Sequence, residues 1–369
     1  MKKFVFISFA LILVVAVLVP GLARGDTGTA TITVTAKMNF PTTLTFNISV
    51  KNSVQVNDIR LHYTVDRLLK SVDVVSEEVV SFTPSKNVST QHIMDMRQTG
   101  GFPPGSSMTY WITAIDANGA VSETLPQKVA MDDQRYTWKS LKQGMVTLYW
   151  YNGSNSFGQT LMDAAQQALG KVTQNSGAEL ASPVKIYVYA SSTDLQGALI
   201  FAQDWTGGIA FTEYGIIAIG IGTSSAEVTW GKGAIAHELT HLVVHQVVFN
   251  PYNDIPPWLD EGLAMNSEGP LDTQFSVPLA DAEANNTLIS VQSLSSPFSA
   301  YADQAVLAYA ESFQIVKYLI DTYGREKMLA LLNIFKQGSG YNEALQAVYG
   351  FDMTGLNARW QAAAKAVTR

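Results

Sequence analysis

The stretch Gly233-Ala-Ile-Ala-His237-Glu238-Leu-Thr-His241-Leu-Val-Val-His245 contains three of the five histidines in this chain of 369 residues. His237 and His241 are four residues apart, so on a helix they share one face, with Cβ atoms roughly 5–6 Å apart. Two imidazoles at this spacing can bind one metal ion, and Glu238, the next residue round the helix, can reach a water on that ion. The remaining residues are mostly apolar, which predicts a buried helix that carries a metal site.

A catalytic zinc site needs a third protein ligand and an open position for water. Glu261 is the best candidate, in the stretch Pro256-Pro257-Trp258-Leu-Asp-Glu261-Gly262-Leu-Ala264. Proline is favourable in a first helical turn, so a second helix should start near Pro257, close enough in sequence to pack against the first. We therefore expect Zn²⁺ to be bound by His237, His241 and Glu261.

The two motifs together, His-Glu-x-x-His and then Trp-Leu-x-Glu-Gly-Leu-Ala, resemble the gluzincin metallopeptidases, and especially their bacterial peptidase MA-like group. The likeness runs from about Met145 to the C-terminus and includes Tyr309-Ala-Glu-Ser312 and Tyr323-Gly324-Arg-Glu. It implies a thermolysin-like α+β domain with a mostly helical C-terminal half. It also implies that a zinc-activated water hydrolyses a peptide bond, with Glu238 as general base. Gluzincins commonly use a tyrosine or histidine to stabilise the oxyanion, and Tyr309 is the candidate here.

The sequence departs from the motifs of two related groups of metallopeptidases, and these departures indicate which kind of peptidase it is. A metzincin would have a third histidine at position 247, which is a valine. His245 is four residues after His241 and is interpreted as a neighbour on the same helix face. The Gly-x-Met-Glu-Asn signature of gluzincin aminopeptidases is missing upstream of His237, and Phe211-Thr-Glu213 resembles it only weakly. The sequence therefore favours an endopeptidase.

Two features around the site stay open. The glycine-containing apolar run 214–221 is a candidate wall of the cleft, where an extended peptide would pair through its backbone, or else an ordinary core strand. Hydrogen-bond partners for the two histidines should exist, and Glu268, Asp303 and Glu311 are available.

Residues 1–25 have the pattern of a signal peptide. Met1-Lys2-Lys3 is a basic start, residues 4–19 are apolar, and small residues precede a cut before Asp26. We expect cleavage and export; the alternative is an uncleaved membrane anchor, and in both cases the rest of the chain lies outside the cytoplasm. The chain has no cysteine, so it has neither disulfides nor a thiolate metal site.

Residues 26–133 predict an all-β sandwich, because short β-branched runs alternate with turn residues. Residues 108–119 resemble the last hairpin of an immunoglobulin-like or fibronectin type III-like module. Strands are expected at 29–36, 44–50, 59–65, 79–82 and 108–115. The peptidase domain follows at 134–369, with strands at 145–151, 184–189, 207–211 and 214–221. Its helices are expected at 156–176 (with Ser156 as N-cap), around His237, from Pro257, and at 304–323, 326–337, 341–348 and 354–367.

The net charge of −7 and the pI near 5.3 argue against a nucleic-acid partner. We expect a peptide or protein substrate, a monomer, and association with a membrane or cell surface through the N-terminal segment. Two other functions stay open: an inactive extracellular binding protein, and a zinc hydrolase of non-protein amides such as a cell-wall bond. Retention of Glu238 beside three ligands argues against the inactive form.

Overall fold

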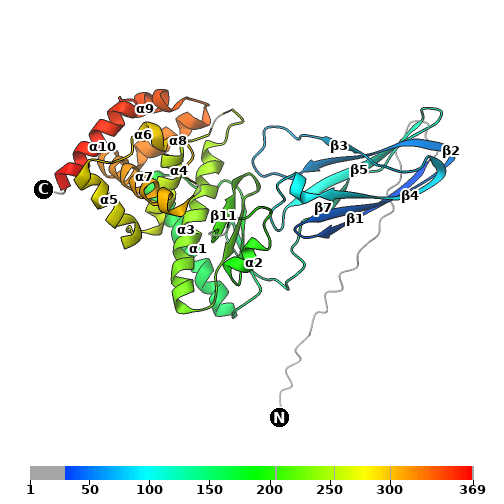
Figure 1. Ribbon diagram of the computed structural model, residues 1–369, viewed down its shortest axis with the longest axis horizontal. Helices are drawn as coiled ribbons and strands as arrows, with labels where there is room; N and C mark the ends of the chain where they lie inside the picture. Colours follow the sequence, from blue (N-terminus) through cyan, green and yellow to red (C-terminus); the bar gives the residue numbers. More distant parts are fainter. Residues whose placement is uncertain (1–29, 204–205, 253, 300, 368–369) are drawn as a thin grey trace, which may run out of the picture.

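In the computed structural model, which describes residues 30–203, 206–252, 254–299 and 301–367, an N-terminal β-rich domain precedes a mixed sheet and a helical C-terminal half (Figure 1). The predicted signal peptide lies outside the described residues. Within the described ranges, none of the helices combines the length and the hydropathy needed to cross a bilayer.

The strands of the N-terminal β-rich domain belong to one hydrogen-bonded sheet. They are β1 (Thr31–Asn39), β2 (Thr43–Val65), β3 (Ser76–Val79), β4 (Ser85–Asp95), β5 (Ser107–Asp116), β6 (Val121–Glu123) and β7 (Gln127–Ala130), with a 3₁₀ turn, η1 (Met96–Gln98), after β4. Every second residue of β5 is buried, which places one face of this strand in the core of the domain.

Strand β2 differs from the sequence-based expectation. The two strands predicted at 44–50 and 59–65 are one strand of 23 residues. Its first part pairs with β1 and β4, and its second part pairs with β3 and β5. The register shifts between Lys51 and Val56, so an irregularity in the pairing, rather than a loop, accommodates the polar residues between the two apolar runs. Because β1, β3, β4 and β5 pair with β2, and β6 and β7 pair with β5, the pairing alone does not establish the two separate sheets of an immunoglobulin-like sandwich.

The mixed sheet has the order β11-β12-β10-β9-β8. The three inner strands are parallel, and the two outer strands are antiparallel to their neighbours. Its strands are β8 (Lys139–Gln143), β9 (Val146–Trp150), β10 (Val184–Tyr189), β11 (Gly208–Phe211) and β12 (Ile216–Gly220), with α2 (Ser192–Gln196) and the 3₁₀ turn η2 (Thr212–Tyr214) between them. Helix α1 (Asn155–Ser176) connects β9 to β10; its N-cap is Ser154 rather than the predicted Ser156, because the Ser154 hydroxyl accepts the Phe157 N–H.

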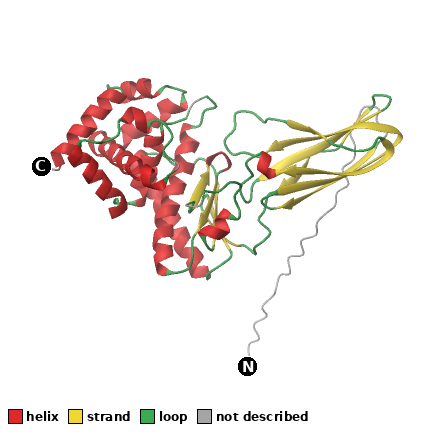
Figure 2. Cartoon of the chain, in the orientation of Figure 1, coloured by secondary structure: helices red, strands yellow, loops and turns green. Residues whose placement is uncertain are grey.

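Both faces of the mixed sheet are covered (Figure 2). Ile186 and Val188 of β10 pack in the core shared with the helices, whereas Tyr187 and Tyr189 pack in the core of the N-terminal β-rich domain. Polar contacts add to this second interface: Lys185 Nζ donates to Gly105 O at 2.6 Å, and Tyr189 Oη donates to Asp133 Oδ2 at 3.0 Å. The β-rich domain is therefore seated on the mixed sheet.

The helical part begins with α3 (Ser225–Val248) and α4 (Pro257–Glu268). It continues with α5 (Thr273–Asn285), α6 (Val291–Leu294), α7 (Ala302–Tyr323), α8 (Arg325–Lys336), α9 (Tyr341–Tyr349) and α10 (Met353–Val367). The last four agree closely with the predicted helices. Helix α5 had no clear pattern in the sequence, because it contains Pro278 and buries only Leu279 and Ala282.

Candidate metal centre

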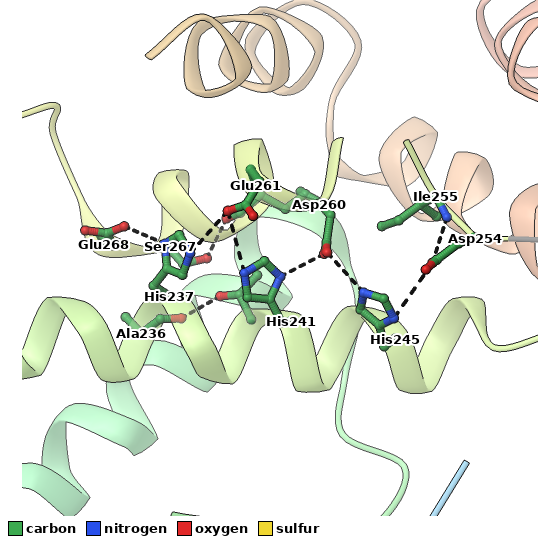
Figure 3. A network of polar contacts seen from close by, with 12 residues as sticks. Ala236, His237, His241, His245, Asp254, Ile255, Asp260, Glu261, Ser267 and Glu268 are labelled. Carbon is green, nitrogen blue, oxygen red and sulfur yellow. Dashed lines mark hydrogen bonds and ion pairs between the residues drawn. The ribbon is translucent and has the colours of Figure 1, made fainter. Parts of the chain in front are cut away.

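Helix α3 presents His237, His241 and His245 along one face (Figure 3). It begins with a capping box, in which the Ser224 hydroxyl accepts the Glu227 N–H and the Glu227 carboxylate accepts the Ser224 N–H. Gly231 lets the helix approach the end of the sheet, since a Cβ there would lie 2.7 Å from Ile221. The apolar residues of α3 bury the rest of the helix and fix the direction of the histidine face.

Helix α4 brings Glu261 to that face. Pro257 is its first residue, as the sequence predicts. Gly262 is in very close contact with α7, because a Cβ at this position would be 2.4 Å from Ser312 O. The glycine that follows Glu261 therefore allows the close helix crossing that holds α4, and with it the carboxylate, against α3.

Three ligand atoms converge between the helices. Glu261 Oε2 is 3.3 Å from His237 Nε2 and 3.7 Å from His241 Nε2. With metal–ligand bonds of about 2.0–2.1 Å, tetrahedral ligands stand roughly 3.3–3.5 Å apart. Glu261 Oε2 is buried and accepts no well-formed hydrogen bond, so it has an unused lone pair in the centre of the group. The donors and their spacing fit a zinc ion.

Carboxylates hold the outer nitrogens of the same histidines. His237 Nδ1 is 2.7 Å from Glu268 Oε1, and His241 Nδ1 is 2.9 Å from Asp260 Oδ1. Asp260 Oδ2 is also 3.0 Å from His245 Nε2, so one carboxylate lies between two imidazoles (Figure 3). Such partners orient the ring and raise the basicity of the nitrogen that faces the metal.

The buried ionisable groups of the site shift one another's pKa values. Burial alone would lower the pKa of His237, but the carboxylates of Glu261 and Glu268 raise it well above its usual value. Burial also opposes protonation of His241, yet Asp260 and Glu261 raise its pKa to about 9. The same carboxylates that raise the pKa of both imidazoles would also favour a cation bound between them.

Glu238 and Tyr309 face the same cavity, whose volume is about 890 Å³. Burial raises the pKa of Glu238, and the Ala210 N–H donates to its carboxylate. Gly208 lies against this side chain, since a Cβ there would be 3.0 Å from Glu238 Oε1. Burial and the nearby carboxylates, Glu261 first among them, raise the pKa of Tyr309, so its hydroxyl stays protonated and can donate.

Some sequence-based candidates lie elsewhere. Of the three partners suggested for the histidines, Glu268 is at the site, whereas Glu311 accepts the Ile289 N–H away from it. The side chain of Asp303 lies outside the described residues. Asp260 was missed, although its position directly before Glu261 on the same helix end was a usable signal.

Of the two interpretations left open for 214–221, the structure supports the core strand. The residues of β12 are all buried between β10 and β11 and do not line the cavity. The edge strand β11 lines the cavity instead. Strand β11 is short and has polar neighbours in the sequence, so the more apolar β12 gave the stronger hydrophobic pattern.

Comparison with known proteins identifies a family to which this chain is similar. The model of the Peptidase MA superfamily matches residues 164–366, which include every residue of the metal centre. This chain belongs to the Peptidase MA superfamily. A comparison with curated protein sequences gives no match.

Solved structures with similarity to this chain include peptidases of low sequence identity. Aminopeptidase A from Legionella pneumophila is 12% identical over 86% of this chain and 47% of that protein, with a TM-score of 0.40. An M1 zinc metallopeptidase from Deinococcus radiodurans is 12% identical over 91% and 94% of the two chains, with a TM-score of 0.34. The present chain thus spans about half the length of the Legionella enzyme. These low scores carry no conclusion about activity.

Proposed function

We propose that this chain is a zinc-dependent metallopeptidase that hydrolyses internal peptide bonds outside the cytoplasm. The observation that carries the proposal is the convergence of His237 Nε2, His241 Nε2 and Glu261 Oε2 beside Glu238 in a large cavity. Membership of the Peptidase MA superfamily supports the same reaction class.

Each residue has a defined part in this reaction. His237, His241 and Glu261 hold the zinc, and Glu268 and Asp260 keep the two imidazoles in the required orientation. A zinc ion in such a site supplies Lewis-acid chemistry, because it acidifies water and polarises a carbonyl. Glu238 takes a proton from the attacking water and passes it to the leaving amine; burial raises its pKa towards the range that suits a base. Tyr309 keeps its proton and donates a hydrogen bond from its hydroxyl to the carbonyl oxygen as negative charge develops.

The substrate backbone has a natural place along β11. This strand is at the edge of the mixed sheet and lines the cavity, so an extended peptide can pair with it by β-augmentation. The Ala210 N–H in the same strand donates to Glu238, which places the bound backbone next to the general base.

Internal cleavage is supported by the surroundings of Glu213. In the sequence this residue is the weak counterpart of the glutamate that holds a substrate amino terminus. Glu213 Oε2 instead pairs with Arg67 Nε of the β-rich domain at 3.2 Å, and the residue does not line the cavity. Its carboxylate is therefore engaged away from the place where a free amine would bind.

The proposal also includes features that follow from the sequence alone. Residues 1–25 direct export, either as a cleaved signal peptide or as an anchor, and the protein acts as a monomer. Residues 26–133 form an immunoglobulin-like or fibronectin type III-like module, and residues 134–369 form a thermolysin-like domain.

The test compares the purified protein with Glu238→Gln. Stoichiometric zinc is expected in both, and cleavage of an unbiased peptide library is expected only in the wild type. Wild-type protein without stoichiometric metal, or equal cleavage by both proteins, would contradict the proposal. Zinc without cleavage of any peptide would favour a binding protein or a hydrolase of non-protein amides.

A further inference from the structure

The cavity has an apolar part that the chemistry of the metal site does not use. Phe201 and Trp230 both line it, and they expose 76% and 49% of their surface. Phe275 and Met265 line the same cavity. Large aromatic side chains that remain this exposed inside a cavity provide contact area for a ligand rather than for the core.

Trp230 is close to the reacting groups. It precedes His237 by seven residues on α3, which is two helical turns or about 10 Å along the axis. An extended peptide covers that distance in about three residues. Its indole lies against Gly207, where a Cβ would be 3.0 Å from the ring, so Trp230 stands beside the beginning of β11. A peptide paired with β11 would therefore bring a side chain near this ring.

Phe201 has an unusual backbone conformation. Its φ is +60°, in the left-handed region that residues with a Cβ rarely adopt. A residue that is both strained and exposed gains little from packing, and such residues cluster where a ligand is held. Phe201 therefore needs neighbours that keep the chain in this conformation.

The N-terminal β-rich domain supplies those neighbours. Its 99–105 loop follows η1 and contributes Gly100, Gly101 and Phe102 to the cavity lining. Gly101, with φ of +84°, lies so close to Ile200 that a Cβ would be 2.7 Å from Ile200 Cγ1. The contact fixes the residue directly before Phe201.

Two further contacts hold this arrangement. Arg135, which follows the β-rich domain, donates from Nη1 to Gly197 O at 2.7 Å, so the segment that leads to Phe201 is attached at its beginning as well. Gly105 at the end of the loop lies against Tyr187 of β10. The loop and the 197–200 segment are thus fixed to each other and to the mixed sheet.

We propose that Phe201 and Trp230 receive a bulky apolar side chain of the peptide substrate, and that the 99–105 loop of the β-rich domain keeps Phe201 in place. The inference rests on the proposed peptidase function and names its substrate class. Charge argues against one alternative: Glu238, Asp260, Glu261 and Glu268 line the cavity, and among the described residues no lysine or arginine does. An acidic substrate side chain is therefore disfavoured, and the exposed rings of Phe201 and Trp230 favour an apolar one.

The first experiment identifies the preferred residue and then removes its site. The wild type is given an unbiased peptide library, and the best sequence is made in two versions, with Phe or Ala near the cut bond. Phe201→Ala and Trp230→Ala are expected to lower kcat/KM for the Phe peptide by about tenfold more than for the Ala peptide. Zinc content should not change.

The second experiment tests the loop with a matched pair of substitutions. Gly101→Ala adds a methyl group that meets Ile200, whereas Gly119→Ala adds one at a similar φ of +82° with nothing within 4 Å. Only Gly101→Ala is expected to reduce the preference for the Phe peptide. Ile200→Ala, which removes the contact without backbone strain, should act in the same direction if Gly101→Ala does not fold.

The outcomes separate this inference from the function on which it rests. If the wild type cuts no peptide, both are overturned. If it cuts peptides without preferring large apolar residues, or if the four variants affect the Phe and Ala peptides equally, only the inference is overturned.

Discussion

Helices α3 and α4 border one part of the cavity, and the 99–105 loop with the 197–203 segment borders another. In the helical part, the charged side chains come from two helices and pair over at most 31 residues of sequence, and short contacts between carboxylates and imidazoles fix them. In the loop part, glycines of the β-rich domain make close contacts with residues about a hundred positions later. The first part is suited to chemistry, and the second to the selection of a substrate. Substitutions in the two parts should therefore have separable effects.

The largest expected effect in the helical part is that of Glu261→Gln. The amide keeps the shape of the side chain but removes the charge that faces two imidazole nitrogens. Zinc affinity should fall by more than the roughly 10–100-fold that follows loss of a partner outside the ligand set. Zinc titration by competition with a chelator measures this, together with peptide cleavage, which should fall to background.

Trp230→Ala is the control, because Trp230 lines the same cavity and the variant keeps every ligand. It should retain zinc while it changes peptide preference. If Glu261→Gln binds zinc with wild-type affinity, the assignment of Glu261 as the third ligand is contradicted.

The second effect concerns the stability of the helical half. Glu311 is fully buried on α7, and burial raises the pKa of its carboxyl from 4.5 to about 8. The folded state therefore keeps a proton that the unfolded state loses above about pH 4.5. The stability associated with the neutral form is complete below that pH and is lost as the pH rises towards 8. The loss should be on the order of a few kcal/mol.

Glu311→Gln tests this, since the amide imitates the neutral acid and keeps an acceptor for the Ile289 N–H. Urea unfolding at pH 5.5 and pH 8.5 should show a smaller difference for the variant than for the wild type. Equal pH dependence in the two proteins would contradict the raised pKa.

The third effect concerns the close packing of α4, the helix that carries Glu261, against α7. Gly262→Ala places a methyl group against Ser312 O, so α4 must move away from α7. Overpacking of this kind costs about 1–3 kcal/mol. Gly170→Ala in α1 is the control, because its methyl group meets nothing within 4 Å and alanine should stabilise a helix by roughly 0.5–1 kcal/mol. Thermal unfolding of both variants measures the difference; destabilisation by both alike would contradict the packing argument.

The same contrast explains what could be predicted from the sequence. His237, His241 and Glu261 were found because helical spacing brings residues together locally, and Pro257 marks the start of the second helix. The hairpin of β11 and β12 was also predicted, but the sequence left open whether 214–221 is the cleft wall or a core strand, and the structure shows a core strand. Which strand lies at a sheet edge depends on long-range pairing that a hydrophobic run does not reveal.

Other features of the structure also depend on contacts between segments that are far apart in the sequence. The continuous strand β2 was predicted as two strands, because the polar residues between its two apolar runs resemble a turn. Its register shifts against β4 and β5 depend on long-range pairing. The contact between Gly101 and Ile200 joins two segments with no shared pattern. Asp260 was missed for a different reason: its place directly before the predicted ligand Glu261 was a usable signal, but that signal was not used.

Asp260→Asn should have the smallest of these effects. The amide can still accept a hydrogen bond, but it loses the negative charge between His241 and His245. His241 becomes less basic, and zinc affinity should fall by about tenfold.

His245→Gln removes only the outer imidazole and should change zinc affinity less, because the contact between Asp260 and His241 remains. Competition with a chelator ranks the variants, and the preference for a Phe peptide should stay unchanged in both. A larger loss in His245→Gln than in Asp260→Asn would mean that His245 itself takes part in metal binding, through the group it forms with His241 and Asp260.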